Sequence, residues 1–343
     1  PKPSNGRAQL MLASFTAAAL STGVALPSGT GAGARGPGAW LPRSAQDQLR
    51  RDAAPAAGLA DRVLQLEPDL VLIAGYALAG SLAESDLPAI RNRAGMSFLP
   101  LAGVDPLFRL PVYRDALQGF RTLIAVTEVE HETLIAIDGS SNREGISLVP
   151  PVLTVGSTRD YSPPSQLGPH PYLLVVASDA QDALADTAMG LARYLRNRLP
   201  GVRMVVLDEG QLANVYEGGA KRMHLDVLSR TDVRRLMAGA VALIDLSHRM
   251  ILGLDVLESM MLGTPVVVPA DGIGRQHAER GDGGLWFTNA QELVECARAL
   301  LDPTVRESLA VGGRQYATSE YGSGRDLVGQ LSEALLGESS GLE

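Results

Sequence analysis

The segment SHRMILGLDVLESMMLG, from Ser247 to Gly263, runs directly into TPVVVPADGIG, from Thr264 to Gly274. Within it, apolar residues recur at three- and four-residue spacing and predict a short helix with one buried face: Leu254, Leu257, Met260 and Met261. The run that follows, Pro265 to Val268, is short and apolar, as in a buried β-strand, and ends in a glycine-rich turn. A loop, a helix, a strand and a glycine turn in this order are typical of a nucleotide pocket.

Glu258 lies next to the apolar face of the predicted helix. A carboxylate in such a place needs a hydrogen-bond partner or an opposite charge, and the two hydroxyls of a ribose are one suitable partner. Gly253 and Leu254 open the helix, where free backbone N–H groups and the helix dipole favour a phosphate. In the alternative reading, Glu258 pairs with a neighbouring arginine of an ordinary amphipathic helix. The spacing leaves both readings open.

The run from Val241 to Leu285 resembles the donor-binding half of retaining GT-B glycosyltransferases of the sucrose-synthase-like family, family four. The family pattern is roughly P-S-x-x-E-G-F-G-L-x-x-x-E-A-M-A-x-G-x-P-V-V, followed by a glycine turn. The residues that match it in register are Ser247, Gly253, Leu254, Glu258, Met260, Gly263, Pro265, Val266, Val267, Gly272 and Gly284. Two weaker stretches, Phe98 to Leu134 and Ile146 to Ser178, resemble the first domain of that family and its crossing into the second.

The resemblance implies the GT-B fold, an α/β architecture of two doubly wound Rossmann-like domains facing a cleft. The expected divisions are an acceptor-side domain over 1–150, a linker over 151–171, a nucleotide-sugar-side domain over 172–315, and a C-terminal helix over 316–343 that returns to the first domain. Short apolar runs alternate with helical patterns, which independently predicts parallel sheets covered on both faces.

Strands and helices follow from these patterns along the chain. The predicted strands are Leu70 to Ala74, Phe98 to Leu101, Leu123 to Thr127, Tyr172 to Ala177, Arg203 to Leu207, Ala240 to Asp245 and Pro265 to Val268. The predicted helices are 44–66, 180–198, 231–238, 254–262 and Ala290 to Leu301. Near the N-terminus, the uncharged run from Leu10 to Leu26 follows Lys2 and Arg7. We interpret 7–22 as a buried first helix rather than as a secretory signal peptide.

Three departures separate the chain from the family pattern. The family motif has two glutamates, and the position of the first, which usually contacts the transferred sugar, is Met250. The family's basic pair after the first strand of the second domain is replaced by Ser178 and the acids Asp179, Asp182 and Asp186. Such acids repel a diphosphate by about 1 kcal/mol or more even in a solvated site. The family's His-Asp-Glu-Pro-like loop has become Ala102 to Pro106.

The resemblance also implies roles for individual residues. The candidate donor-binding residues are Gly6, Arg7, Ser178, Arg230, Ser247, Gly253, Leu254 and Glu258, and the candidate catalytic residues are Asp105 and Arg249. Glu258 would hold the ribose, and Gly253, Leu254, Gly6 and Arg7 the diphosphate. Arg7, Arg230 or Arg249 would replace the missing cations. The simpler reading of each arginine is a solvated surface group.

Composition limits the partners of the chain. The net charge of −8 argues against a nucleic-acid partner. The single cysteine, Cys296, excludes an internal disulfide, and the five histidines lack zinc-like spacing, so we expect neither a metal nor a cofactor. A location in the cytoplasm, or at the inner face of the membrane, is expected. The implied partners are a nucleotide-sugar donor, a carbohydrate or lipid acceptor, and a partner glycosyltransferase subunit.

Three functions fit the sequence. The first is a nucleotide-sugar-dependent glycosyltransferase of retaining type with an unidentified acceptor. The second is a catalytically inactive relative that serves as a partner or scaffold subunit, which Met250 and the acidic segment favour. The third is a carbohydrate or nucleotide sensor. A nicotinamide-dependent Rossmann enzyme is disfavoured because no G-x-G-x-x-G lies between a strand and a helix of the first βαβ unit.

Overall fold

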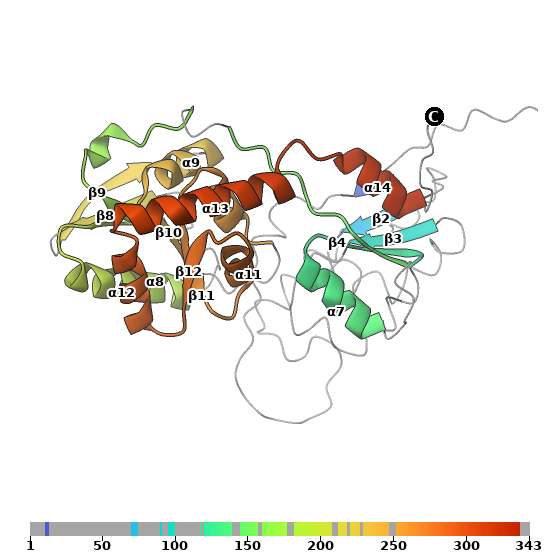
Figure 1. The fold of residues 1–343 in the computed structure, drawn as a ribbon, viewed down its shortest axis with the longest axis horizontal. Helices are drawn as coiled ribbons and strands as arrows, with labels where there is room; N and C mark the ends of the chain where they lie inside the picture. The colour runs from blue at the N-terminus through green and yellow to red at the C-terminus, as the bar shows by residue number, and fades with distance from the viewer. Residues whose placement is uncertain are drawn as a thin grey trace, which may run out of the picture. The chain divides into compact units, whose positions relative to one another are not determined.

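The computed structural model of the chain describes residues 11–13, 70–74, 90, 95–99, 117, 120–138, 145–156, 160–176, 182–207, 212–217, 220–226, 229–246 and 252–336. The described residues divide into two compact units. The first ends at Pro150 and resumes at Asp326, and the second is Pro151–Arg325 (Figure 1). Both units are α/β, with parallel strands and helices packed on them, so the predicted class of two Rossmann-like units is confirmed.

The first unit is built on five parallel strands in the order β1-β2-β3-β4-β5. Their bounds are β1 Met11–Ala13, β2 Leu70–Ala74, β3 Gly95–Leu99, β4 Thr122–Ala125 and β5 Ile146–Leu148. The described residues of this unit include the helices α7 (Glu128–Asp138) and α14 (Leu327–Leu336). Apolar residues of α14, Ala334 and Leu335, pack with Leu72, Ile124 and Val149 in one buried cluster. The end of the chain therefore contributes to the core of the first unit.

The start of helix α7 is capped by the side chains of Thr127 and Glu130. Thr127 Oγ1 accepts a hydrogen bond from Glu130 N at 3.2 Å, and Glu130 Oε2 accepts one from Val126 N at 2.8 Å. Glu130 is fully buried. The pattern resembles a capping box, in which two backbone donors at a helix start are satisfied by nearby side chains.

The second unit is built on seven strands in the order β12-β11-β10-β6-β7-β8-β9. Their bounds are β6 Tyr172–Val176, β7 Arg203–Leu207, β8 Leu212–Glu217, β9 Ala220–Asp226, β10 Ala242–Asp245, β11 Val266–Pro269 and β12 Gly284–Phe287. The strands from β12 to β7 pair in parallel. Strand β8 pairs antiparallel with both β7 and β9, so a hairpin extends one end of the sheet.

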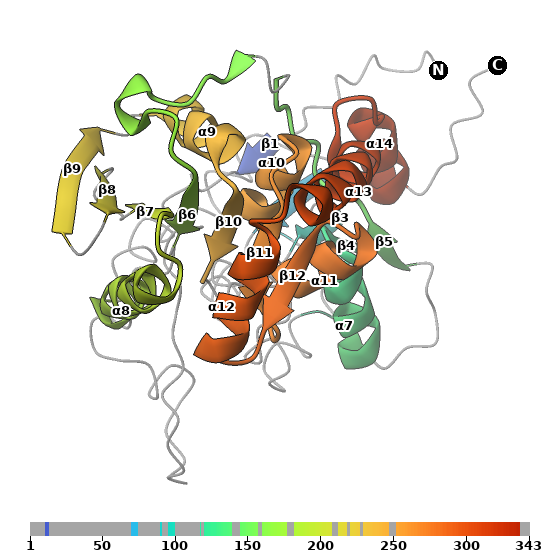
Figure 2. The same cartoon turned by 60° about the vertical axis from the view of Figure 1, so that its left-hand side comes forward.

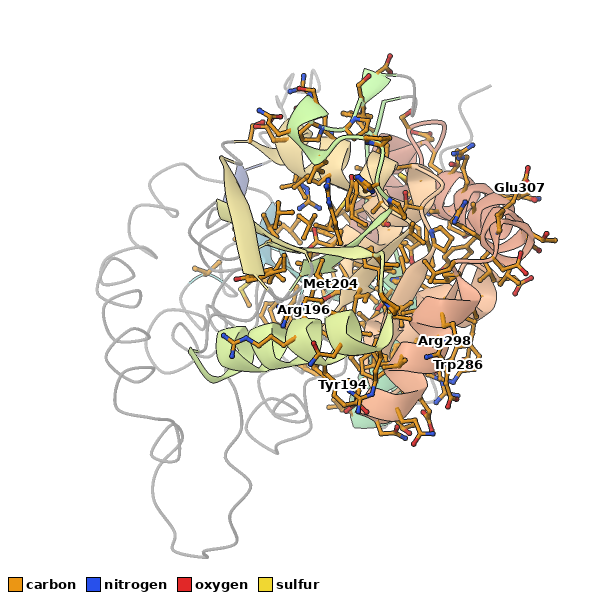
Figure 3. The ribbon with its side chains drawn as sticks, turned by 90° about the vertical axis from the view of Figure 1, so that its left-hand side faces the viewer. Tyr194, Arg196, Met204, Trp286, Arg298 and Glu307 are labelled. Atoms are coloured by element: carbon orange, nitrogen blue, oxygen red, sulfur yellow. The ribbon has the colours of Figure 1, made fainter. Side chains whose placement is uncertain are left out.

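Helices cover both faces of this sheet (Figure 2). Their bounds are α8 Asp182–Arg198, α9 Arg230–Gly239, α10 Leu254–Met261, α11 Ile273–Arg280, α12 Ala290–Ala299 and α13 Pro303–Tyr321, with a short 3-10 helix, η5, at Ser165–Leu167. One buried cluster joins α8 and α12 to one face, and a second joins α9, α10 and the end of α13 to the other. Met204 of β7 is fully buried on the α8 side, beneath the helix that carries Tyr194 and Arg196 (Figure 3).

Most strand predictions are confirmed, with boundaries shifted by a few residues. Strands Leu70–Ala74 and Arg203–Leu207 fall where the sequence places them. The strand predicted at Phe98 to Leu101 is Gly95–Leu99, and the helix predicted at 254–262 is Leu254–Met261. The predicted helix over 44–66 lies outside the described residues.

Two predictions are wrong. Met11–Ala13, within the predicted helix 7–22, form strand β1, which pairs in parallel with β2. A short uncharged apolar run fits a buried strand as well as a buried helix, so periodicity could not separate them. The second sheet is not wholly parallel, because the β8–β9 hairpin is antiparallel.

Within the described part of the chain, no helix has the length and apolar character needed to cross a bilayer.

Candidate functional site

The order of strands in the second unit marks one position for a ligand. Strands β6 and β10 are neighbours, and the chain proceeds outward from β6 through β7 and from β10 through β11 and β12. In open α/β sheets, ligands bind beyond the carboxyl ends of the strands at such a switch point. Ser178 and Ser247 follow these two strands in the sequence and lie outside the described residues.

The helices that follow β10 and β11 begin differently from their neighbours. Helices α9, α12 and α13 are capped by the side chains of Ser229, Asn289 and Asp302. Helices α10 and α11 begin at Gly253 and Gly272, which have no side chain to offer. The first N–H groups of a helix have no partner within the helix. In the described part of this carboxyl edge, two helices therefore start at a residue that offers no side-chain cap, an arrangement that suits an anion.

A cluster of two arginines and two carboxylates lies beside the first turn of α10. Glu258 is 5% exposed, and both of its oxygens accept hydrogen bonds from α9. Arg234 donates from Nη2 to Oε1 at 2.8 Å and from Nε to Oε2 at 3.0 Å. Arg230 donates from Nε to Oε2 at 2.9 Å, and its Nη2 lies 2.5 Å from Asp255 Oδ1. The formal charges of this Arg–Glu cluster cancel.

The electrostatics keep both arginines charged. Burial lowers the pKa of Arg230, but the carboxylates of Asp255 and Glu258 outweigh this effect and raise the pKa above its ordinary value. The hydrogen bonds to Glu258 raise the pKa of Arg234, with a smaller contribution from Tyr161 of the 151–171 segment. The Arg230 side chain is 41% exposed and that of Arg234 is 19% exposed. Arg230 is therefore the cation of the cluster that is better able to reach a ligand.

The pairing of Glu258 corresponds to the alternative that the spacing left open. Its carboxylate is held by arginines from a neighbouring helix, which offsets the cost of burying its charge. A carboxylate offers about four acceptor positions, and the three hydrogen bonds donated by the arginines occupy three of them. The ribose role of Glu258 remains a prediction, and among the described residues one acceptor position of this carboxylate has no hydrogen-bond donor.

Four of the candidate donor-binding residues are described, and the structure brings them together. Gly253 and Leu254 begin α10, Glu258 lies one turn further along it, and Arg230 contacts Glu258. Leu254 is 42% exposed. The candidates outside the described residues are Gly6, Arg7, Asp105, Ser178, Ser247 and Arg249.

Sequence reasoning missed two residues at this site, Arg234 and His277. Arg234 lies four residues after Arg230, so both fall on one face of α9, and that spacing was the available signal. His277 of α11 is 2% exposed and contacts the Leu252 carbonyl at the start of α10. A single histidine in a helical pattern gives no signal of such a contact.

Comparison with known proteins gives a fold but no family. No protein-family model matches the chain, and no curated protein matches it. Among solved structures, it is similar to Anabaena HepE in complex with UDP, at 17% identity and a TM-score of 0.61, over 82% of this chain and 82% of that one. It is also similar to sucrose-phosphate synthase from Thermosynechococcus elongatus, at 14% identity and a TM-score of 0.58, over 88% of this chain and 82% of that one. A putative UDP-N-acetylglucosamine 2-epimerase from Listeria monocytogenes matches at 18% identity and a TM-score of 0.55, over 83% and 79% of the two chains. These likenesses support the GT-B type of fold.

Proposed function

We propose that this protein binds a nucleotide sugar at the switch point of its second unit and transfers the sugar to a carbohydrate or lipid acceptor with retention of configuration. One observation carries the proposal: the uncapped start of α10 lies beside the Arg–Glu cluster. Amide donors, a cation and a carboxylate are the groups that a diphosphate joined to a ribose requires. UDP-glucose is the first donor to test, and UDP is the nucleotide part of it, because HepE was crystallised with UDP and with UDP-glucose.

The roles of the residues follow from their exposure. The backbone N–H groups at Gly253 and Leu254 would bind the diphosphate, where the helix dipole favours negative charge. Arg230, at 41% exposure, would turn from the carboxylates to the phosphates, while Arg234 keeps its two-pronged contact with Glu258. That movement leaves Glu258 two acceptor positions, one for each ribose hydroxyl.

The chemistry places most of the demand on the departing diphosphate. In retaining transfer, the bond between the sugar anomeric carbon and the diphosphate oxygen breaks, and an acceptor hydroxyl forms the new bond on the same face. The helix amides and Arg230 would stabilise the negative charge that develops on the diphosphate. Arg249 and Arg7 are further candidate cations, Asp105 a candidate catalytic acid, and Gly6, Ser178 and Ser247 further donor contacts. All remain predictions from the resemblance.

Calorimetric titration with UDP-, GDP- and ADP-glucose tests the proposal. We expect one of them to bind, and we expect Glu258→Ala to weaken that binding about 10- to 100-fold, the usual loss for hydrogen bonds to a charged group. Glu279→Ala is the matched control, because Glu279 is 40% exposed and pairs only with Arg275 of its own helix among the ion pairs described. Unchanged affinity in Glu258→Ala would rule out the ribose contact.

A non-catalytic partner subunit is the second candidate function. The observation that favours it is the engagement of both Glu258 oxygens by arginines, together with Met250 in place of the sugar-facing glutamate. The same titration separates the two candidates. Binding followed by slow release of free sugar supports a transferase, binding without turnover a sensor, and no binding of any nucleotide sugar the partner subunit.

A further inference from the structure

His277 is a buried histidine whose two ring nitrogens both have partners. Nε2 lies 2.9 Å from the carbonyl oxygen of Leu252, and Nδ1 lies 3.0 Å from the hydroxyl of Tyr316. A carbonyl oxygen can only accept, so Nε2 carries the proton. In the neutral ring Nδ1 must then accept from the Tyr316 hydroxyl. The contacts therefore specify one tautomer of His277, which the Leu252 carbonyl selects and the Tyr316 hydroxyl accommodates.

The ring of His277 also packs against the turn that opens α10. Gly253 has φ 63° and ψ 48°, in the left-handed region. A Cβ added to Gly253 would lie 3.3 Å from His277 Cδ2 and 3.3 Å from Ile273 Cγ2. Glycine adopts this conformation readily but is not held in it by its own side chain. The bond to Leu252 and the contact with the ring therefore brace the turn from outside.

Helix α13 supports this brace from behind. The Tyr321 ring meets the His277 ring edge to face, with centroids 5.6 Å apart, and the Tyr316 ring lies 6.1 Å from that of Tyr321. Tyr321 is itself fixed, since its carbonyl accepts a hydrogen bond from Leu153 N at 2.7 Å. The Leu252–Gly253 turn is thus tied through His277 to α13 and to the segment that follows Pro150.

We propose that His277 is a positioning residue for the donor site: it holds the Leu252–Gly253 turn so that the N–H groups of the first turn of α10 stay aimed at the diphosphate. This inference rests on the proposed function. It differs from an ordinary buried histidine in one respect, because its loss should weaken nucleotide binding without removing any group that touches the nucleotide.

Two substitutions of His277 separate positioning from packing. His277→Leu replaces the ring with an apolar side chain of similar size and removes both hydrogen bonds. His277→Gln keeps a side-chain N–H that can reach the Leu252 carbonyl. Tyr316→Phe is the additional variant should His277→Leu fail to fold, because it removes the hydroxyl that donates to Nδ1 and leaves the contact of Nε2 with the Leu252 carbonyl in place. Each variant is measured by backbone amide exchange without ligand at Leu257, whose N–H donates to the Gly253 carbonyl at 3.0 Å, and by calorimetric titration with UDP.

We expect His277→Leu to speed exchange at Leu257 and to raise the Kd for UDP about tenfold, the effect of one lost hydrogen bond. His277→Gln should restore both values toward the wild type, and Tyr316→Phe should change both in the same direction by less. An exchange rate in His277→Leu equal to that of the wild type would overturn the brace. If the leucine variant does not fold, the same result in Tyr316→Phe would overturn it. Faster exchange with an unchanged Kd would overturn the positioning role.

Failure of the proposed function is seen separately, in the wild-type protein. If the wild-type protein binds neither UDP nor UDP-, GDP- or ADP-glucose, the donor site itself is refuted, and the positioning role with it. The His277 inference alone fails when the wild type binds and the variants either bind equally well or keep the wild-type exchange rate.

Discussion

Helices α7 and α10 both follow a parallel strand, β4 in the first unit and β10 in the second, but they begin in opposite ways. At α7, Thr127 Oγ1 accepts from the N–H of Glu130 in the first turn, and Glu130 Oε2 accepts from the N–H of Val126 just before it. At α10, Gly253 brings no side chain, and the turn is held from outside by His277 while Arg230 and Glu258 lie beside it. A helix start closed by its own side chains serves stability, whereas one left open and braced from elsewhere remains available to a ligand.

Among the substitutions that test this difference between the two helix starts, we expect the loss of Arg234 to have the largest effect on stability. Arg234→Ala leaves a buried Glu258 with only the half-exposed Arg230, and we expect a loss of about 3 kcal/mol in the free energy of unfolding of the second unit. Arg235→Ala is the control, because its pair with Asp232 is exposed and should contribute about 0.5 kcal/mol. Urea denaturation followed by circular dichroism measures both. Equal losses would mean that the Arg–Glu cluster is no more than a surface ion pair.

Low pH should protonate His277 and weaken its support of the start of α10. This protonation should not affect the start of α7. Burial lowers the pKa of His277, the Leu252 carbonyl opposes this effect, and the nearby charge of Arg280 adds a smaller lowering, so that the pKa is about 4. The unfolded chain, with a histidine pKa near 6.5, binds the proton first, so stability falls as the pH drops from about 6.5 to 4, by about 3 kcal/mol in all.

The measurement for this prediction is the urea midpoint of the second unit across that pH range. His277→Leu should flatten the dependence, since it removes the titrating group. A profile that keeps its slope in His277→Leu would assign the dependence to other groups.

A side chain at Gly253 should damage the open helix start. Gly253→Ala must hold an alanine in the left-handed region, at a cost of about 1–2 kcal/mol, and its Cβ would crowd His277. Gly190→Ala is the matched control, because Gly190 lies exposed in α8 with nothing within 4 Å of an added Cβ. That change should stabilise the protein by up to about 1 kcal/mol. If both substitutions changed the free energy of unfolding in the same direction, the strain assigned to the Gly253 turn would be contradicted.

The closed helix start of α7 gives the smallest expected effect. Thr127→Ala removes one cap and should cost about 1 kcal/mol of stability. Because the first unit is not where we place the donor, the variant should bind UDP as the wild type does. A loss of affinity in Thr127→Ala comparable to that expected for Glu258→Ala would remove the distinction between the two helix starts.

The sequence predicted the sheets well where strands are continuous apolar runs. Leu70–Ala74 and Arg203–Leu207 were found because burial on both faces leaves an unbroken apolar signal. The β8–β9 hairpin was missed because its strands mix polar and apolar residues, although Gly218 and Gly219 between them are a known turn signal. Met11–Ala13 was misjudged because a short apolar run has no decisive period.

The site was only half predictable, for a physical reason. The start of α10 could be found because Gly253, Leu254 and Glu258 are close in the sequence. The arginine partners of Glu258 lie 24 and 28 residues away, and Tyr316 lies 39 residues from His277. Such pairings depend on how helices pack on the sheet, which residue spacing along one helix does not reveal.

Amide hydrogen exchange of the wild-type protein, measured with and without saturating UDP, tests the central claim most directly. If the open start of α10 binds the diphosphate, UDP should slow exchange at Leu254, Asp255 and Val256 and leave the first turn of α7 unchanged. Bound UDP that leaves the exchange of those three amides unaltered, or that protects α7 instead, would contradict a donor site at the switch point of the second unit.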